Sequence, residues 1–141
     1  MTATKRAGKA VPGFRIKRVY EPADDDGLRV LVDRLWPRGI AKEKAHVDQW
    51  LKDVAPSDAL RKRFHGNPQM WDEFLAAYDR ELAREPAAAA VAALRALVRK
   101  QPVTLLYAAR DETHNNAVAL KKFLERKGPA RNRPLKAPGR T

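Results

Sequence analysis

The chain has 141 residues and a formal net charge of +12, and it contains no cysteine. This length favours one domain that is large enough to bury a core. The absence of thiols excludes disulfides, thiolate metal sites and cysteine nucleophiles, and it fits a reducing compartment. No apolar run approaches the roughly 20 residues that a membrane span needs, and no apolar segment follows the basic N-terminus. We therefore expect a cytoplasmic protein with no membrane partner.

The positive charge is concentrated at the two ends of the sequence. Residues 1–13 carry three basic side chains and no acid, residues 127–141 carry five and no acid, and residues 14–126 hold the remaining +4. Both ends are rich in Pro, Gly and Ala and lack the apolar content of a core, so we expect disordered basic tails around one domain over residues 14–126. Such tails either bind nucleic acid through counterion release or only keep the ends solvated.

Two strands are predicted near the start of the domain. Residues 14–20 alternate apolar and basic side chains, which is typical of a strand whose polar face carries Arg15 and Lys17. Residues 29–35 contain consecutive apolar side chains, which indicates a strand covered on both faces. The short connection predicts a hairpin between the two strands. It contains three aspartates at residues 24–26, which lack the ligand spacing of a calcium loop.

Helical patterns fill the middle of the chain. Apolar residues at helical spacing predict a helix over residues 43–54. Ser57 is expected to cap a second helix, and Asn67 before Pro68 is typical of the start of a third. Pro86 begins a fourth helix over a run of alanines, which have the highest helix propensity.

A last strand and a last helix complete the domain. After Pro102, the apolar residues 103–109 predict a second buried strand, and a final helix ends near Arg126. The order of strand, strand, helices, strand and helix indicates an α/β fold. We expect a small mixed or parallel sheet flanked by about five helices in a single domain.

Two charged loops directly follow the two buried strands. Residues 33–39 contain a carboxylate, two arginines and a tryptophan, and residues 110–116 contain an arginine, two acids, a histidine and two asparagines. If the two strands are parallel neighbours, both loops open at the edge of the sheet where α/β folds place their ligand crevice. The start of the last helix would also favour an anion there. The sequence therefore predicts a crevice for a small anionic ligand, such as phosphate or a nucleotide-like metabolite.

Nine residues of these loops are candidates for the site. Histidine is the side chain that most readily exchanges a proton near neutral pH, so His114 is a candidate acid or base. Asp33 is the second candidate catalytic residue, because its carboxylate could accept a proton or orient an arginine. Arginine forks suit phosphate or carboxylate, and amides and indoles can contact the rest of a ligand. The candidate ligand-binding residues are Arg34, Trp36, Arg38, Arg110, Asp111, Asn115 and Asn116.

Several features exclude better-known sites. The three histidines lack metal-ligand spacing, and the sequence contains no P-loop, no dinucleotide glycine pattern and no nucleophile elbow. We therefore predict neither a metal nor a cofactor. Structural roles remain open for the candidates: Trp36 as a core residue, Asp111 or Thr113 as a helix cap, and the charged residues as a buried network without a ligand.

Six blocks of the sequence resemble one known family. They are Asp33-Arg-Leu-Trp-Pro-Arg-Gly39, Trp50-Leu-Lys52 with Ala55-Pro-Ser57, Leu60-Arg61 with Phe64-His65, Trp71 through Leu82, Leu105-Leu-Tyr-Ala-Ala-Arg-Asp111, and His114-Asn-Asn-Ala117. Over about residues 14–126, the chain resembles the YeaO-like proteins, a branch of the domain of unknown function 488 family. The resemblance implies a compact α/β domain and assigns no reaction. Longer relatives carry a Cys-His-Arg type segment in place of residues 113–116, so a thiol mechanism cannot carry over and only His114 matches.

Three functions fit these features. The first is a crevice that binds a small anionic ligand, with or without a reaction on it. The second is a nucleic-acid-binding accessory protein that uses its basic tails together with Arg15 and Lys17. In the third, Asp33, Arg34 and their charged neighbours have a purely structural role.

Overall fold

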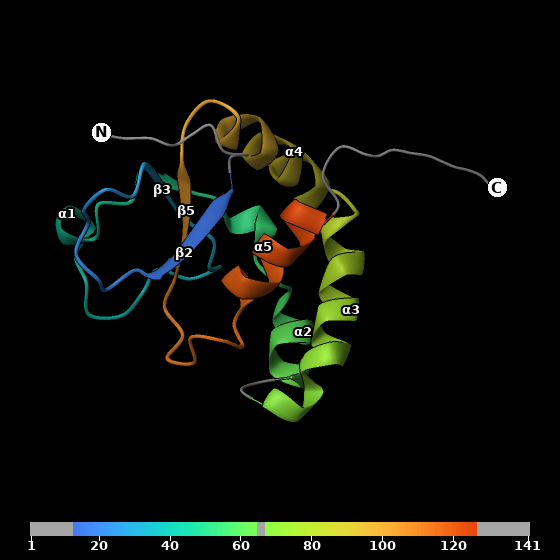
Figure 1. Cartoon of the computed structure of the whole chain (residues 1–141). Helices are drawn as coiled ribbons and strands as arrows, with labels where there is room; N and C mark the ends of the chain where they lie inside the picture. The colour runs from blue at the N-terminus through green and yellow to red at the C-terminus, as the bar shows by residue number, and fades with distance from the viewer. Residues whose placement is uncertain (1–12, 65–66, 127–141) are drawn as a thin grey trace.

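A computed structural model describes residues 13–64 and 67–126. The predicted tails, apart from Gly13, and His65 lie outside the described residues. The elements, in chain order, are β2 (Phe14–Arg18), β3 (Leu28–Leu31), α1 (Lys42–Ala45), β4 (Gln49–Trp50), the 3₁₀ turn η1 (Lys52–Val54), α2 (Asp58–Arg63), the 3₁₀ turn η2 (Pro68–Met70), α3 (Trp71–Leu82), α4 (Ala87–Val98), β5 (Val103–Tyr107) and α5 (Asn116–Arg126). This is the predicted α/β class with five α-helices in the described part of the chain (Figure 1).

The four described strands form one parallel sheet in the order β2-β5-β3-β4. β5 is a central strand, and Phe14 of β2 and Leu28 of β3 both lie opposite its Val103. All five residues of β5 are buried, as predicted for a strand that is covered on both faces. The sheet is therefore the parallel one of the two alternatives that the sequence allowed.

The predicted hairpin between the first two strands is wrong. β2 and β3 run parallel, and β5 pairs with both of them from between. Residues 19–27 therefore carry the chain back along the sheet to the end where β2 began. A hairpin would need β2 and β3 to be antiparallel neighbours. The short connection did not reveal that β5, which begins more than 70 residues after β3, lies between them.

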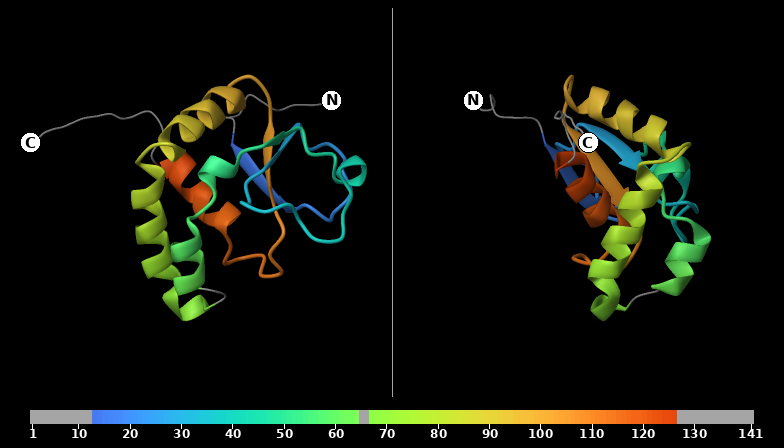
Figure 2. Two further views of the ribbon diagram at one scale, coloured as in Figure 1. Left: turned by 180° about the vertical axis from the view of Figure 1, so that it is seen from behind. Right: turned by 90° about the vertical axis from the view of Figure 1, so that its right-hand side faces the viewer.

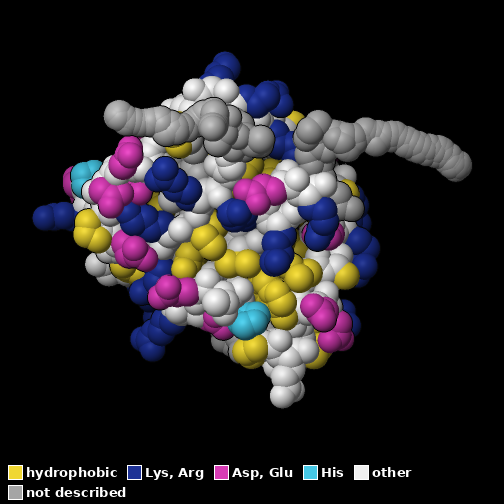
Figure 3. All heavy atoms as spheres, in the orientation of Figure 1, with side chains coloured by type: hydrophobic (Ala, Val, Ile, Leu, Met, Phe, Trp, Pro, Cys, Tyr) yellow, Lys and Arg dark blue, Asp and Glu magenta, His cyan; other side chains and the backbone are white. Residues whose placement is uncertain are grey.

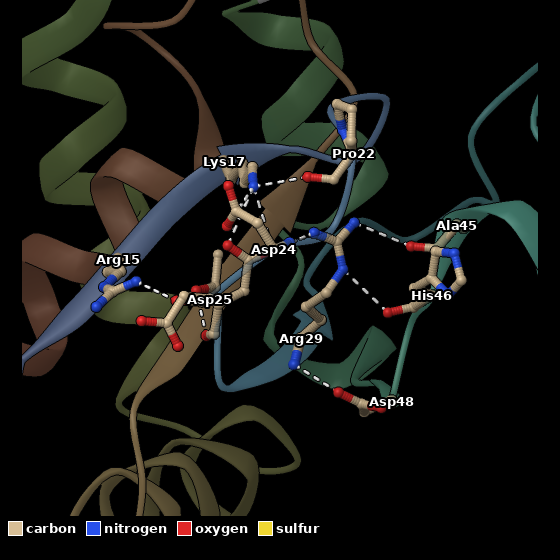
Figure 4. Close-up of polar contacts among 11 residues, drawn as sticks. Arg15, Lys17, Pro22, Asp24, Asp25, Arg29, Ala45, His46 and Asp48 are labelled. Carbon is tan, nitrogen blue, oxygen red and sulfur yellow. Dashed lines mark hydrogen bonds and ion pairs between the residues drawn. The ribbon is translucent and has the colours of Figure 1, made fainter.

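A buried ion cluster of Asp26, Arg29 and Lys17 holds this return segment. The Asp26 carboxylate accepts hydrogen bonds from the Arg29 guanidinium and, at 3.0 Å, from Lys17 Nζ, and both Asp26 and Arg29 are buried. Arg29 also donates to the carbonyls of Ala45 and His46, so it joins the segment to the end of α1 (Figure 4). Burial opposes ionisation of Asp26, but the hydrogen bonds from Lys17 and Arg29 outweigh it and lower its pKa to about 2.

The two faces of the sheet carry different cores. On one side, α3, α4 and α5 pack over the larger core (Figures 1 and 2). Its fully buried members include Val30, Leu105, Tyr78, Leu94 and Leu120. On the other side, the loops around α1 cover a smaller core built from Val19, Leu31, Ala45 and Leu106. Loops and the short helix α1 therefore cover the second face.

The predicted helix over residues 43–54 is also wrong. α1 ends after Ala45 because His46 takes a left-handed backbone conformation with φ +52°. Gln49 and Trp50 then pair with β3 as the short edge strand β4, and η1 follows. Val47 and Trp50 pack against the smaller core, so burial in a loop and a strand produced the spacing that indicated a helix.

The other helix signals are confirmed. The Ser57 side chain accepts the Leu60 N–H at 3.1 Å and begins α2, and the Asn67 side chain accepts the Gln69 N–H at 3.1 Å ahead of Pro68. α4 begins directly after Pro86. No described helix is long and apolar enough to cross a membrane.

Candidate functional site

The two charged loops open onto one cleft at the carboxyl edge of the sheet. β3 and β5 are parallel neighbours, as the site prediction required, and the pairing continues through the Val32 N–H to the Leu106 carbonyl at 3.1 Å. The cleft has a volume of about 710 Å³, which is in the size range of sites for organic ligands. It is lined by all nine predicted residues: Asp33, Arg34, Trp36, Arg38, Arg110, Asp111, His114, Asn115 and Asn116.

Asp33 joins the two strands and the last helix at this edge. One of its carboxylate oxygens accepts the Ala108 N–H at 2.9 Å, just beyond the end of β5, and the other accepts the Asn116 side-chain amide at 3.0 Å. Its backbone carbonyl accepts the Trp50 indole N–H at 2.7 Å. Burial raises the pKa of Asp33 above its ordinary value, while the hydrogen bonds from Asn116 and Ala108 favour the charged form and limit the rise.

The two asparagines at the start of α5 have different partners. Asn115 caps the helix, because its side-chain oxygen accepts the Val118 N–H at 2.9 Å. Asn116 donates to Asp33 and to the Val32 carbonyl, so it fixes the helix start to the end of β3. The expectation that Asp111 or Thr113 caps this helix is therefore wrong, since the cap lies closer to the helix.

Asp111 instead organises the turn that presents His114. One of its carboxylate oxygens accepts the backbone N–H groups of Thr113 and His114, both at 2.9 Å, and these bonds lower its pKa to about 2. The other oxygen lies 3.2 Å from Nδ1 of His114. A carboxylate can only accept, so Nδ1 is the protonated nitrogen in this contact and Nε2 of the neutral ring is left as an acceptor. This Asp–His pair can hold or transfer a proton at Nε2.

The three candidate arginines differ in their surroundings. Arg34 donates to the carbonyls of Ala55 and Pro56 at 3.3–3.4 Å and lies 3.9 Å from Asp58. Arg38 and Arg110 are exposed, and their guanidinium groups have no hydrogen-bond or ion-pair partner within residues 13–64 and 67–126. Two fork-shaped cations at the cleft are therefore available to a ligand.

A single polar network does not connect the charged candidates. Among the residues that the structure describes, the side chains of Asp33, Arg34, Arg38 and His114 share no hydrogen bond with one another. Trp36 has a structural partner: it donates from Nε1 to the Ile40 carbonyl at 2.7 Å and meets Trp50 edge-on. It is only half-buried and also lines the cleft.

The sequence did not predict the aromatic side of the cleft. Phe64, Trp71 and Phe74 also line it, and none of the three was among the predicted site residues. Trp71 stacks on Phe74 with 5.6 Å between ring centroids and meets the His114 ring edge-on at 5.1 Å.

In the part of the chain that the structure describes, acidic and histidine side chains do not gather into a metal site. Within the described ranges, no group of three or more His, Asp or Glu residues could hold an ion. Asp24 and Asp26, which lie in the aspartate run, bind Lys17 instead.

Comparison with known proteins places the chain in a family. Residues 13–138 match the family described as the inactive DUF488-N3 subclade. The chain belongs to this subclade. It is 46% identical over 112 residues to the uncharacterized protein YeaO of Escherichia coli, and this alignment covers 79% of this chain and 96% of YeaO. It is also 46% identical over 111 residues to the uncharacterized protein Rv3073c of Mycobacterium tuberculosis, with coverage of 78% and 92%. No solved structure matches the chain.

Proposed function

We propose that the cleft of this DUF488-N3 protein binds a small metabolite through an anionic group, with phosphate the preferred group. The observation that carries the proposal is the position of Arg38 and Arg110. They come from loops that are far apart in sequence, both line the cleft, and neither has a charged partner in the described part of the chain. Guanidinium groups bind phosphate or carboxylate oxygens in pairs, so two of them can hold one anion from two directions.

The start of α5 supports the same ligand charge. The Asn115 side chain accepts the Val118 N–H, and the backbone N–H of Asn116 has no acceptor among the described residues. Free N–H groups and the positive end of the helix dipole favour an anion at this position. Asn116 itself lines the cleft.

Binding without a reaction fits the local contacts better than catalysis. The family carries the description inactive. Both carboxylate oxygens of Asp33 already accept hydrogen bonds, which suits a positioning role. His114 and Asp111 keep the geometry of an acid–base pair, so a catalytic role remains the alternative. Its test is whether a bound phosphate ester is hydrolysed by the wild-type protein and left intact by a His114→Ala variant.

The proposal is tested by a thermal-shift screen of the full chain with phosphate, sulfate, sugar phosphates and nucleotides. A ligand at 100 times its dissociation constant adds about 2.7 kcal/mol to the free energy of unfolding, which is a measurable shift. We expect phosphate-bearing ligands to raise the melting temperature of the wild-type protein. In Arg38→Ala and in Arg110→Ala, the affinity for these ligands should fall at least about ten-fold, and the shift should shrink accordingly. Arg99→Ala is the matched control, because Arg99 is exposed but does not line the cleft. Equal shifts in all three variants would reject the cleft as the binding site.

Nucleic-acid binding through the tails is the second candidate function. Eight basic residues and no acid lie in residues 1–13 and 127–141. On the face seen in Figure 3, basic and acidic side chains are interspersed, without a continuous basic stripe. Lys17, which was expected to help bind nucleic acid, forms ion pairs with Asp24 and Asp26. The tails would therefore supply most of the electrostatic attraction.

A further inference from the structure

The cleft is unusually rich in aromatic side chains for a site that holds only an inorganic anion. Five of the chain's ten Phe, Trp and Tyr residues line it. Three of them, Phe64, Trp71 and Phe74, form what we call the aromatic wall. Phe64 meets Phe74 edge-on at 6.1 Å, and Trp71 stacks on Phe74 at 5.6 Å with an interplanar angle of 13°.

Trp71 is the member of this wall with accessible surface. Phe64 and Phe74 are buried, whereas Trp71 is half-buried. Its position is fixed by the stack on Phe74 and by the edge-on contact with the His114 ring at 5.1 Å. An indole that is held rigidly at the surface of a cleft offers a platform for a planar ring at little entropic cost.

The aromatic wall and the free cations come from different elements. The wall belongs to the end of α2 and the start of α3, whereas Arg38 and Arg110 belong to the loops after β3 and β5. A phosphate or sulfate ion would occupy only a small part of the 710 Å³ and would leave the aromatic surface in water. A complementary ligand therefore needs an apolar planar part as well as an anionic part.

From this arrangement, and on the basis of the function proposed above, we infer that the ligand is an aromatic ring joined to a phosphate, the chemistry of a nucleoside monophosphate. The ring stacks on Trp71, and the phosphate lies between Arg38 and Arg110. Base stacking on an aromatic side chain tolerates any base, so the wall selects for a ring rather than for one base.

The test separates the ring from the anion with four probes: adenosine monophosphate, ribose 5-phosphate, adenosine and inorganic phosphate. Affinities for the full chain are measured by calorimetry in about 0.15 M salt, which weakens nonspecific attraction to exposed charges. We expect adenosine monophosphate to bind at least about ten-fold more tightly than ribose 5-phosphate, and adenosine to bind weakly. A fifth probe, cytidine monophosphate, checks base selectivity and should bind within a few-fold of adenosine monophosphate.

Substitutions at Trp71 test whether the aromatic wall causes the preference for adenosine monophosphate over ribose 5-phosphate. Trp71→Leu should bring the affinity for adenosine monophosphate down to that for ribose 5-phosphate and leave the latter unchanged, and Trp71→Phe should keep most of the preference. Arg110→Ala should weaken both phosphate ligands by the same factor. The unchanged affinity of Trp71→Leu for ribose 5-phosphate also serves as the control for folding.

Each contrary result has a different meaning. If ribose 5-phosphate binds as tightly as adenosine monophosphate, or if Trp71→Leu keeps the preference, the inferred ring is rejected and the anion site stands. If adenosine binds as tightly as its monophosphate, the anion site itself fails. If none of the four probes binds, both the proposed function and this inference are rejected.

Discussion

The side-chain amide of Asn116 donates a hydrogen bond to the carboxylate of Asp33 at 3.0 Å, although 83 positions separate the two residues. The second carboxylate oxygen accepts the Ala108 N–H beyond the end of β5. One side chain thus joins the ends of two neighbouring strands to the start of α5. The lining of the cleft depends on this junction, because both charged loops begin at it.

We predict that Asp33→Asn destabilises the protein by about 1–3 kcal/mol, because one of the two donors at this position would then face an NH₂ group. The measurement is the free energy of unfolding from urea denaturation at neutral pH. Asp53→Asn is the control, since Asp53 is exposed and should change stability by less than about 0.5 kcal/mol. Equal stability of Asp33→Asn and the wild type would contradict the role of the junction.

Acid sensitivity is predicted to come in part from Asp26. Its folded pKa of about 2 lies below the ordinary value of 3.8, so its contribution to stability is present above pH 3.8 and is lost as the pH falls through 2. The size of this contribution is on the order of 2 kcal/mol. Urea denaturation between pH 5 and pH 2 should show a shallower pH dependence for Asp26→Asn than for the wild type.

Asp26→Asn should also be less stable at neutral pH by about 3–5 kcal/mol, because Arg29 would stay buried without its anion. The control is Asp25→Asn, which changes a neighbouring exposed aspartate. Its pH dependence should match that of the wild type. If Asp26→Asn keeps the full wild-type slope, the acid sensitivity has another origin.

Two glycines with the same backbone conformation are predicted to differ in their tolerance of alanine. Gly27 and Gly39 have φ values of +67° and +76°. A Cβ on Gly27 would lie 2.3 Å from the Pro102 carbonyl oxygen, whereas a Cβ on Gly39 would have no neighbour within 4 Å. Gly39→Ala should therefore cost only the left-handed backbone strain of about 1–2 kcal/mol. Gly27→Ala should lower the free energy of unfolding clearly more than Gly39→Ala does, as measured by urea denaturation. Equal losses would show that the chain at Gly27 and Pro102 approaches less closely than the structure indicates.

Nucleic-acid binding is predicted to depend on the tails. Deletion of residues 1–13 and 127–141 removes eight basic side chains, so it should weaken binding to duplex DNA and flatten the dependence of log K on log salt. Fluorescence anisotropy over a salt series measures both effects, and circular dichroism checks that residues 14–126 stay folded. Binding that survives the deletion with an unchanged slope would place the contact on the folded domain instead.

Local signals in the sequence were sufficient for much of the fold. Ser57, Asn67 and Pro86 marked helix starts because a cap or a proline acts within one turn of the chain. The apolar runs in β3 and β5 predicted strands that are covered on both faces. These runs also indicated where the cleft lies, because a charged loop that follows a buried strand opens at the edge of a parallel sheet.

Only the tertiary structure decided which segments lie side by side. β5 enters between β2 and β3 although it follows them by about 70 residues or more, and no local pattern states that pairing. The same limit explains residues 43–54, where His46 ends the helix and Trp50 pairs with β3. Apolar residues of a loop or a strand that are buried by tertiary contacts can show the same spacing in the sequence as the buried face of a helix. For this reason the two charged loops could be predicted from the sequence. Trp71 and the aromatic wall became part of the cleft only because α3 packs against α2, α4 and α5.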